Sequence, residues 1–451
     1  MTKKILKTIQ SYLRKNEMGP LHDFLKTLRP GDISEAMKGL DEDERKTVFG
    51  LLGVESASGL FHEVDIPLIS RILQDWDNAR LAKILDITAP DDGADVLGVL
   101  LHKKREKVLR SMDKKKAKEV QNLLAYDEKT AGGIMTTDFV TLSQDLKVRE
   151  TLEYIRKNVN VETVHHLYII DREECLVGVL PLRRLIAVSP EREDITLKDI
   201  MTSNVIATNV NTDQEEIAKL VAQHNLLALP VVDEEGRMVG RITVDDVIDV
   251  VQQEANEDFY KMAGALWEAG YLDKTLFTKT RMRLPWLLAC LLGGVITGSI
   301  VMFFKEAISQ VIILASFIPV IMAVGGSVGL QSSTIVIRGI ATGHVDIHAI
   351  QKFLFKEISV GLVLGLICGL GIGIAAWFWP EGSPALGLVV GIAMFTALTV
   401  ATTFGALFPA LFKRLNVDPA VAAGPFITTV IDVAAIAIYL GLATMLLHFL
   451  V

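Results

Sequence analysis

One carboxylate stands inside an apolar stretch of the kind that crosses membranes. Asp432 lies in GPFITTVIDVAAIAIYL, residues 424–440, and no charged residue occurs from Val421 up to it or after it through Val451. A carboxylate in lipid is costly unless it is hydrated or paired, and no Lys or Arg stands inside another apolar stretch to pair with it. We expect Asp432 to face water or a cation. The alternative is a protonated side chain that hydrogen-bonds a neighbouring helix.

The residues one helical turn from Asp432 divide by polarity. Thr428 and Thr429 precede it, and Ala435 and Ile436 follow it. The threonine end of this helix face is therefore predicted to line a pore.

Five stretches are apolar enough for helices that cross a bilayer core of about 30 Å, which takes roughly 20 residues each. They are residues 284–304, 311–335, 358–379, 384–412 and 421–448, and Asp432 is the only carboxylate inside any of them. The second ends in MAVGGSVGLQSSTIVIRG, whose glycines and hydroxyl residues indicate close packing or exposed carbonyls next to a cavity.

The distribution of basic residues orients these spans. Nine Lys and Arg lie directly before the first span, between the second and third, and between the fourth and fifth, whereas the other two loops hold only Lys305; they are Lys274, Lys279, Arg281, Arg283, Arg338, Lys352, Lys356, Lys413 and Arg414. The positive-inside rule therefore predicts that the preceding 283 residues are cytoplasmic.

The charge and cysteine content describe the soluble part. The formal charge of the 451 residues is −8, and residues 127–283 hold 18 basic and 28 acidic groups, whereas residues 1–126 come to +2. Cys175, Cys290 and Cys368 form neither a disulfide framework nor a CxxC pair, which fits a reducing compartment. The first twenty residues lack the apolar core and cleavage site of a signal peptide.

An internal repeat occupies the acidic part. GIMTTDFVTLSQDLKVRETLEYI is echoed by DIMTSNVIATNVNTDQEEIAKLV, so that Met135 returns as Met201 and Gly178 as Gly240. Each copy predicts strand, helix, strand, turn, strand and helix. This order resembles a tandem pair of CBS domains, the α/β modules that commonly act as sensors.

Some CBS domains hold the ribose of an adenine nucleotide through G-x-x-[ST]-x-x-D. Gly240, Thr243 and Asp246 match this motif in the second copy, whereas Pro181 and Arg184 replace its Thr/Ser and Asp in the first. The resemblance therefore makes Thr243 and Asp246 candidates for nucleotide binding. A purely structural role is weighted equally for Asp246: a carboxylate at the start of a helix is favoured by the helix dipole.

Helical segments flank the repeat. Apolar spacing with Pro, Gly and Asp punctuation through residue 126 predicts a superhelical bundle, in which Asp91 and Asp95 lie near a helix start where capping is the first explanation. After the repeat, Glu254, Glu257 and Asp258 share one face of a predicted helix that leads to the membrane. The alternative interpretation is that this acidic face is simply exposed to solvent and binds nothing.

The order of these parts resembles the MgtE family of magnesium channels and transporters over residues 20–451. YDEKTAGGIMTTDFV and DPAVAAGPFITTVIDV lie at two of its junctions. The predicted domains are a helical domain over 1–126, a CBS pair over 127–253 with copies at about 135–190 and 199–253, a connecting (plug) helix over 254–283, and a five-helix transmembrane domain over 284–451. The fold class is thus multi-domain, α-helical except for the α/β CBS pair.

The resemblance also implies a function and its residues. It implies a homodimer in the cytoplasmic (inner) membrane that imports Mg²⁺, is not an enzyme, has no nucleic-acid partner, and is closed by cytosolic Mg²⁺. Asp432 would line the narrow point of the pore and Asp418 its mouth. The matching cytosolic magnesium positions are Asp91, Asp95, Glu215, Asp246, Asp249, Glu254, Glu257 and Asp258.

Elementary chemistry is compatible with this implied function. Mg²⁺ gives up water reluctantly and prefers oxygen ligands, so two facing carboxylates can neutralise it through its water shell. Two departures from the family pattern concern the pore neighbourhood and regulation by ATP: Ser327 replaces a common asparagine, and Arg184 interrupts a nucleotide-contact position.

Other functions are weighed against this one. A zinc protease would need H-E-x-x-H and an ATP-driven importer a Walker A loop, and neither motif occurs. A proton- or sodium-coupled divalent-cation carrier, regulated by nucleotide at the CBS pair, stays open because a lone aspartate also suits a proton relay.

Overall fold

The computed structural model describes residues 2–64, 66–158, 165–266, 271, 275–345, 350–422 and 424–446. It divides into two compact units, Met1–Glu254 and Ala255–Val451. The division falls inside a continuous helix, α16 (Val244–Met262). Each unit is described by itself.

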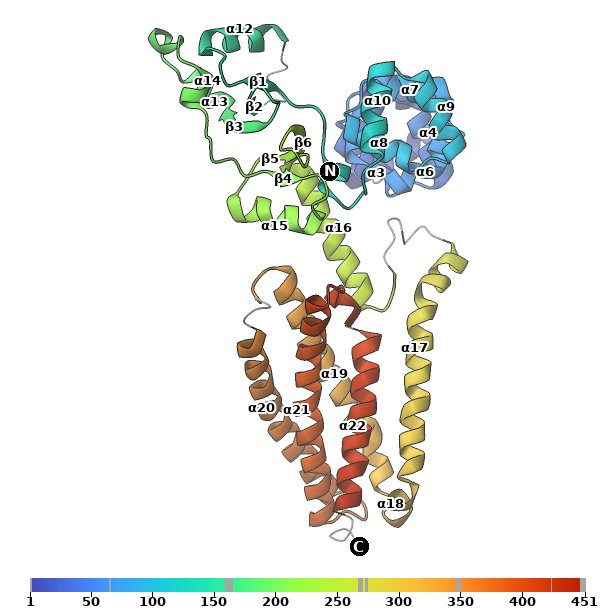
Figure 1. The fold of residues 1–451 in the computed structure, drawn as a ribbon. Coiled ribbons are helices and arrows are strands. Elements are labelled where there is room, and N and C mark those ends of the chain that lie inside the picture. Colours follow the sequence, from blue (N-terminus) through green and yellow to red (C-terminus); the bar gives the residue numbers. More distant parts are fainter. Residues whose placement is uncertain are drawn as a thin grey trace. The chain divides into compact units, whose positions relative to one another are not determined.

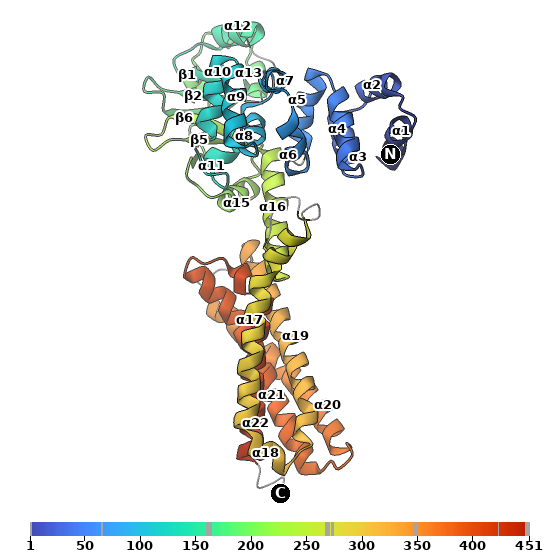
Figure 2. The ribbon, with the colours of Figure 1, turned by 90° about the vertical axis from the view of Figure 1, so that its right-hand side faces the viewer.

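The first unit begins with short helices in a superhelical array (Figure 2). They are α1 (Thr2–Arg14), α2 (Met18–Lys26), α3 (Pro30–Met37), α4 (Glu42–Leu51), α5 (Val54–Glu63), α6 (Ile66–Asp75), α7 (Asn78–Leu85), α8 (Pro90–Gly98), α9 (His102–Ser111) and α10 (Lys114–Leu123).

These helices pack in alternation, which produces a regular offset between contacting residues. α3 packs on α5, α5 on α7 and α7 on α9. Polar contacts accordingly join side chains 29 or 30 residues apart, such as Thr88 to Ser58 and Lys46 to Asp75. The expected superhelical bundle is confirmed, and each helix contacts the helix two positions further along the chain.

Two similar three-stranded sheets follow, with their helices (Figure 1). The first copy has β1 (Thr141–Ser143), α12 (Val148–Asn158), β2 (His166–Ile170), β3 (Leu176–Pro181) and α13 (Leu182–Ile186), preceded by α11 (Ala131–Ile134). The second has β4 (Thr208–Asn209), α15 (Gln214–His224), β5 (Ala228–Val232), β6 (Met238–Thr243) and α16, preceded by η1 (Pro190–Arg192) and α14 (Leu197–Ile200). In each, the first strand is parallel to the second and the third is antiparallel to it.

The two copies exchange equivalent contacts. A Cβ atom on Gly240 would lie 2.4 Å from the sulfur of Met135, and one on Gly178 would lie 2.3 Å from that of Met201. Glycine is needed at both positions because each methionine packs on the backbone of the opposite copy. The repeat predicted from sequence is therefore also a packing repeat.

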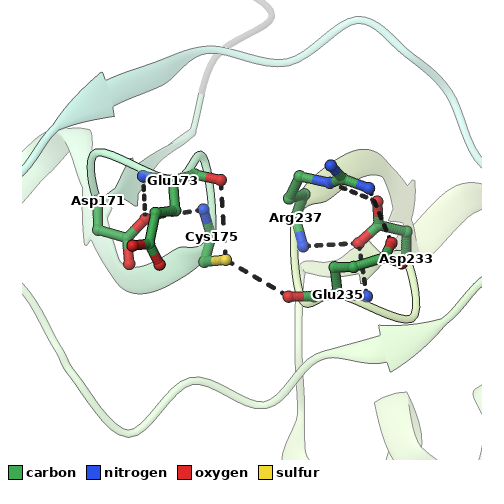
Figure 3. Close-up of polar contacts among 6 residues, drawn as sticks. All are labelled: Asp171, Glu173, Cys175, Asp233, Glu235 and Arg237. Atoms are coloured by element: carbon green, nitrogen blue, oxygen red, sulfur yellow. Dashed lines mark hydrogen bonds and ion pairs between the residues drawn. The ribbon is translucent and has the colours of Figure 1, made fainter.

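The hairpin turns of the two copies lie next to each other (Figure 3). Oδ1 of Asp171 accepts hydrogen bonds from the backbone N–H groups of Glu173 and Cys175. Asp233 does the same for Glu235 and Arg237. The thiol of Cys175 donates across the junction to the carbonyl of Glu235 at 3.4 Å. The aspartate of each copy therefore has the same role, which is to organise its turn.

The hydrophobic core explains why the helical domain belongs to this unit. One buried cluster includes Val96 and Leu97 of α8 together with Met135, Ile217 and Ile242 of the CBS pair. The first CBS copy has a separate core around Leu167 and Leu180. The helical domain thus packs on the second CBS copy through a shared apolar core.

The second unit is helical, and five of its described helices are long and apolar enough to cross a membrane. They are α17 (Leu276–Phe303), α19 (Leu314–Ala341), α20 (Ile350–Trp377), α21 (Pro384–Arg414) and α22 (Pro425–Met445), with α18 (Lys305–Gln310) and η4 (Pro419–Ala422) in loops. They run alongside one another (Figures 1 and 2): α19 packs on α21 and α22, α20 on α21, and α17 on α22.

The observed helix ends differ from the predicted ranges. α16 begins at Val244 and ends at Met262, and α17 begins at Leu276, so residues 254–283 are not one helix. α20 begins at Ile350, eight residues before the predicted span. Charged residues near a membrane surface need not end a helix, because their backbone hydrogen bonds continue while their side chains reach water.

Candidate cation sites

Asp432 is half-buried on α22 and faces α19. A Cβ atom on Gly326 of α19 would lie 3.4 Å from Oδ1 of Asp432 and 4.0 Å from Cγ2 of Thr428. Among the described residues, the carboxylate has no hydrogen bond or ion pair. Because an unpaired carboxylate in a membrane-spanning helix is costly, a cation or water is the partner that its position calls for.

The two threonines near Asp432 lie on different sides of α22. Thr428 shares the Gly326 contact with Asp432, whereas the methyl group of Thr429 packs on Gly293 of α17. Both hydroxyls donate to backbone carbonyls of their own helix, Thr429 to Pro425 at 2.7 Å. The structure therefore supports Thr428 as a neighbour of Asp432 and places Thr429 at the contact between α17 and α22.

Asp91, Asp95 and Asp246 form an acidic corner where α8 meets the second CBS copy. Loss of hydration and the charge of Asp92 raise the pKa of Asp91. Reduced hydration, with Asp92 and Asp91 nearby, raises the pKa of Asp95 to about 7, although this residue keeps an exposed surface. Burial, followed by the charge of Asp91, raises the pKa of Asp246 to about 6. The raised pKa values show that nearby positive charges do not fully neutralise the three carboxylates.

An unpartnered oxygen gives this corner an affinity for a donor or a cation. Oδ1 of Asp91 is buried and has no hydrogen-bond partner in the described part of the chain. A buried acceptor without a partner costs about 1–3 kcal/mol, and a metal-bound water can supply the missing hydrogen bond. The residues present therefore fit a hydrated divalent cation.

The other predicted ligands of the first unit are spread along two helices. Asp249 is exposed on α16, and loss of hydration raises the pKa of its carboxyl. Glu215 on α15 makes an ion pair with Lys219 at 3.3 Å. Nε2 of Gln214 donates to Oε1 of Glu254 at 2.5 Å, which joins α15 to α16.

In the second unit, a lysine holds two of the predicted ligands together. Nζ of Lys261 lies 2.5 Å from Oε1 of Glu257 and also donates to Oδ2 of Asp418. Asp258 is half-buried on the same helix. Burial lowers the pKa of Lys261, but the hydrogen bonds with Asp418 and Glu257 outweigh it and raise the pKa above its usual value. The ammonium group thus lies between two carboxylates and neutralises part of their charge.

No group of three or more His, Cys, Asp or Glu side chains in the described residues is arranged to hold a bare metal ion. Mg²⁺ commonly keeps several waters and binds through one or two carboxylates.

Two cationic side chains in these clusters were not predicted. His62 of α5 lies between Asp92 of α8, 3.4 Å from Nδ1, and Asp245 of α16, 3.6 Å from Nε2. Its hydrogen bond with Asp92 raises the pKa of His62 to about 9. Lys261 is the other. The 30-residue offset of the helical domain could have indicated the pairing of His62 with Asp92, but no local pattern indicates the contact with Asp418.

The nucleotide motif has a structural role in this molecule. The hydroxyl and backbone N–H groups of Thr243 both donate to Oδ2 of Asp246, the latter at 3.2 Å, and so cap α16. In the first copy, Arg184 donates from Nη1 to the hydroxyl of Thr202 at 3.2 Å. Asp246 thus lies in the first turn of α16, where the helix dipole favours a carboxylate as expected, and this position leaves the nucleotide role open.

Three polar side chains lie close together on β2 of the first CBS copy and β6 of the second. Nδ1 of His166, the hydroxyl of Tyr168 and Nε of Arg241 are buried and have no partner among the described residues. Burial lowers the pKa of His166 and raises that of Tyr168 to about 12. Both groups are close enough to Arg241 to feel its charge. Three unsatisfied donors and acceptors suit a polar ligand such as a nucleotide.

Family models match most of the described domains. A model for a divalent cation transporter, MgtE, matches residues 318–442, and one for the MgtE intracellular N domain matches residues 28–129. CBS-domain models match residues 131–191 and 197–253.

Individual proteins are similar over nearly the whole chain. The chain is 33% identical to a magnesium transporter MgtE of Bacillus subtilis (strain 168), over 97% of this chain and 96% of the relative. It is also 33% identical to one of Thermus thermophilus, over 99% of this chain and all of the relative.

Solved structures match about half of the chain. The cytosolic domain of the Mg²⁺ channel MgtE in complex with ATP is 32% identical, with a TM-score of 0.50 over 54% of this chain and 99% of that chain. The soluble part of a magnesium transporter is 28% identical, with the same TM-score over 56% of this chain and 100% of that chain.

Proposed function

The chain belongs to the MgtE family of magnesium transporters, which are not enzymes, and we propose that it imports Mg²⁺ through a channel in the cytoplasmic membrane. The observation that carries the proposal is Asp432. Its carboxylate faces Gly326 of α19 and makes no hydrogen bond or ion pair with any described residue. A hydrated divalent cation would provide the missing positive charge and keep most of its water.

We further propose a homodimer with its N-termini in the cytoplasm. One chain supplies a single carboxylate of this kind, and two copies about an axis would supply two. α17 packs mainly on α22 and leaves most of its apolar surface exposed, so lipid or a second copy must cover it. Mass photometry of the transport-competent particle tests the dimer, and a functional monomer would overturn it.

Replacement of Asp432 tests the pore. Asp432→Asn keeps the size of the side chain and removes its charge, so Mg²⁺ uptake into proteoliposomes should fall about a hundredfold, as expected for a charge–cation attraction in a low-dielectric pore. Thr444→Val is the matched control, because Thr444 is exposed on the same helix and donates to its own Leu440 carbonyl. Near-normal uptake by Asp432→Asn would refute the assignment. The reversal potential in a proton gradient separates a channel from a coupled carrier.

We propose that cytosolic Mg²⁺ closes this channel by binding to the acidic groups of both units. The corner of Asp91, Asp95 and Asp246 supports this, since its carboxyl groups have raised pKa values and Asp91 has an unpartnered oxygen. Glu215, Asp249, Glu254, Glu257, Asp258 and Asp418 are proposed to contribute further carboxylates. A ligand that binds only the compact state must stabilise that state.

Two measurements test the gate. Protease protection of residues 127–283 should rise during a magnesium titration, and a chain without residues 1–126 should lose its inhibition by internal magnesium. If protection stays constant and the truncated chain is inhibited like the full chain, the acidic groups are not the sensor.

We propose that an adenine nucleotide binds the CBS pair and modulates the gate. The buried, unpartnered groups of His166, Tyr168 and Arg241 support a polar ligand, and Thr243 and Asp246 match the ribose motif. ATP should raise the melting temperature of the full chain in a concentration-dependent way. An Arg241→Lys chain that gains the same increase would show that Arg241 is not part of the site.

A further inference from the structure

A second carboxylate lies within the membrane-spanning helices. Because α20 begins at Ile350, Glu357 belongs to this helix, although it precedes the predicted span by one residue. The hydroxyl of Ser332 on α19 donates to Oε2 of Glu357 at 2.9 Å. Ser332 is only 4% exposed, and Glu357 is half-buried. This hydrogen bond therefore joins α19 to α20 at a site partly shielded from solvent.

Small residues bring three helices together around this bond. A Cβ atom on Gly405 of α21 would lie 2.9 Å from Cβ of Ser332 and 2.5 Å from the carbonyl oxygen of Gly329. One on Gly361, a turn after Glu357, would lie 2.0 Å from the hydroxyl oxygen of Thr402 on α21. The backbones of α19, α20 and α21 are thus in close contact, and a small shift of one helix must displace the others.

The same helix α19 carries the residue that faces Asp432. Ser332 follows Gly326 by six positions, a rise of about 9 Å along a helix. Gly326 contacts Asp432 on one side of α19, and Ser332 contacts α20 and α21 on another. A bond that fixes the rotation and height of α19 at Ser332 therefore also fixes the wall next to Asp432.

We propose that Glu357 is a positioning residue for cation passage, which acts through its hydrogen bond with Ser332 to hold α19 in place next to Asp432. The carboxylate accepts this bond from a hydroxyl, and it has no ion pair with a described residue. Its role is therefore geometric, and an amide oxygen in its place accepts the same bond. The inference rests on the proposed transport function.

Mg²⁺ flux into proteoliposomes tests the proposal with a double-mutant cycle. Ser332→Ala and Glu357→Ala should each lower the maximal rate about tenfold, the scale of one lost hydrogen bond to a charged group, and leave the half-saturating Mg²⁺ concentration unchanged. The double variant should be no slower than either single variant. Glu357→Gln should retain most of the rate.

The control and the contrary outcomes are distinct. Ser359→Ala removes an exposed hydroxyl that donates to its own helix at Phe355, so its flux should be normal. Ser332→Ala removes one atom and keeps the test valid if Glu357→Ala fails to fold, as gel filtration and melting would show. Additive losses, unchanged rates, or a Glu357→Gln chain as slow as Glu357→Ala would overturn the proposal. An active Asp432→Asn chain would instead refute the transport function itself.

Discussion

We propose that Lys261 competes with Mg²⁺ for Glu257 and Asp418, so that its replacement should make the channel more sensitive to internal magnesium. In this structure, its ammonium group hydrogen-bonds both carboxylates. The side chains of Lys261 and Glu257 are 22% and 16% exposed, and that of Asp418 is 35% exposed, so solvent screens the pairs only in part. A divalent cation that binds both carboxylates must displace the lysine.

The size of the effect follows from the bonds that are displaced. A hydrogen bond between charged groups contributes about 1.5–3 kcal/mol, and partial exposure favours the lower end of this range. If the net cost of displacing the lysine from both carboxylates is that of one such bond, Lys261→Gln should increase magnesium affinity about tenfold, since ~1.4 kcal/mol is a factor of ten. The internal concentration that halves the flux should fall by the same factor.

Flux from proteoliposomes loaded with graded internal Mg²⁺ measures this concentration. Lys413→Gln is the matched control, because Lys413 is a half-buried lysine in the last turn of α21 with no ion pair to a described residue. Its half-inhibiting concentration should equal that of the unmodified chain. A Lys261→Gln chain that needs the same internal magnesium as the control, or more, would refute the competition.

Two further substitutions test contacts between helices. His62 has a pKa of about 9 in the folded chain, above 6.5, so its stabilising effect is complete below pH 6.5 and disappears as the pH rises through 9. His62→Gln should therefore lower the free energy of unfolding of the helical domain in urea by about 1 kcal/mol at pH 7, a value reduced because the side chain is 46% exposed. At pH 10 the loss should be almost zero. An equal loss at both pH values would contradict the charge-based explanation. Gly329→Ala should slow transport and lower the melting temperature, since its Cβ would lie 1.8 Å from Cδ1 of Ile431 and overpacking costs about 1–3 kcal/mol. Gly441→Ala, with open space around it, should change neither, and equal behaviour of the two variants would show that the α19–α22 contact is not tight.

The sequence predicts the elements of this fold well because their signals are local. Long apolar windows indicate the five spans, and the return of Met135 as Met201 indicates the CBS pair before any contact is known. Helix ends were less predictable. Lys352, Lys356 and Glu357 lower the hydropathy of the first turns of α20 without interrupting its hydrogen bonds.

Contacts between segments that are distant in the sequence could not be predicted from local patterns. Helical spacing places Thr428 and Thr429 together near Asp432, but only the positions of α17 and α19 separate them. The pairing of Lys261 with Asp418 spans 157 residues and leaves no periodic signal. Acidic residues could be identified as candidate cation ligands from their type and position in the sequence. The basic residues that neutralise some of them could not be identified in this way.

These internal cations change the electrostatic argument for gating. From charge alone, the acidic groups of residues 127–283, whose net charge is −10, would repel one another in the absence of magnesium. Instead, His62 bridges Asp92 and Asp245 in one unit, and Lys261 bridges Glu257 and Asp418 in the other. Each bridge keeps carboxylates together without a metal, so under the proposed gating Mg²⁺ would act at Lys261 by exchange with a bound monovalent charge. Such an exchange would raise the magnesium concentration needed for the proposed closure above that of a bare carboxylate pair, which suits a sensor that must ignore low magnesium concentrations.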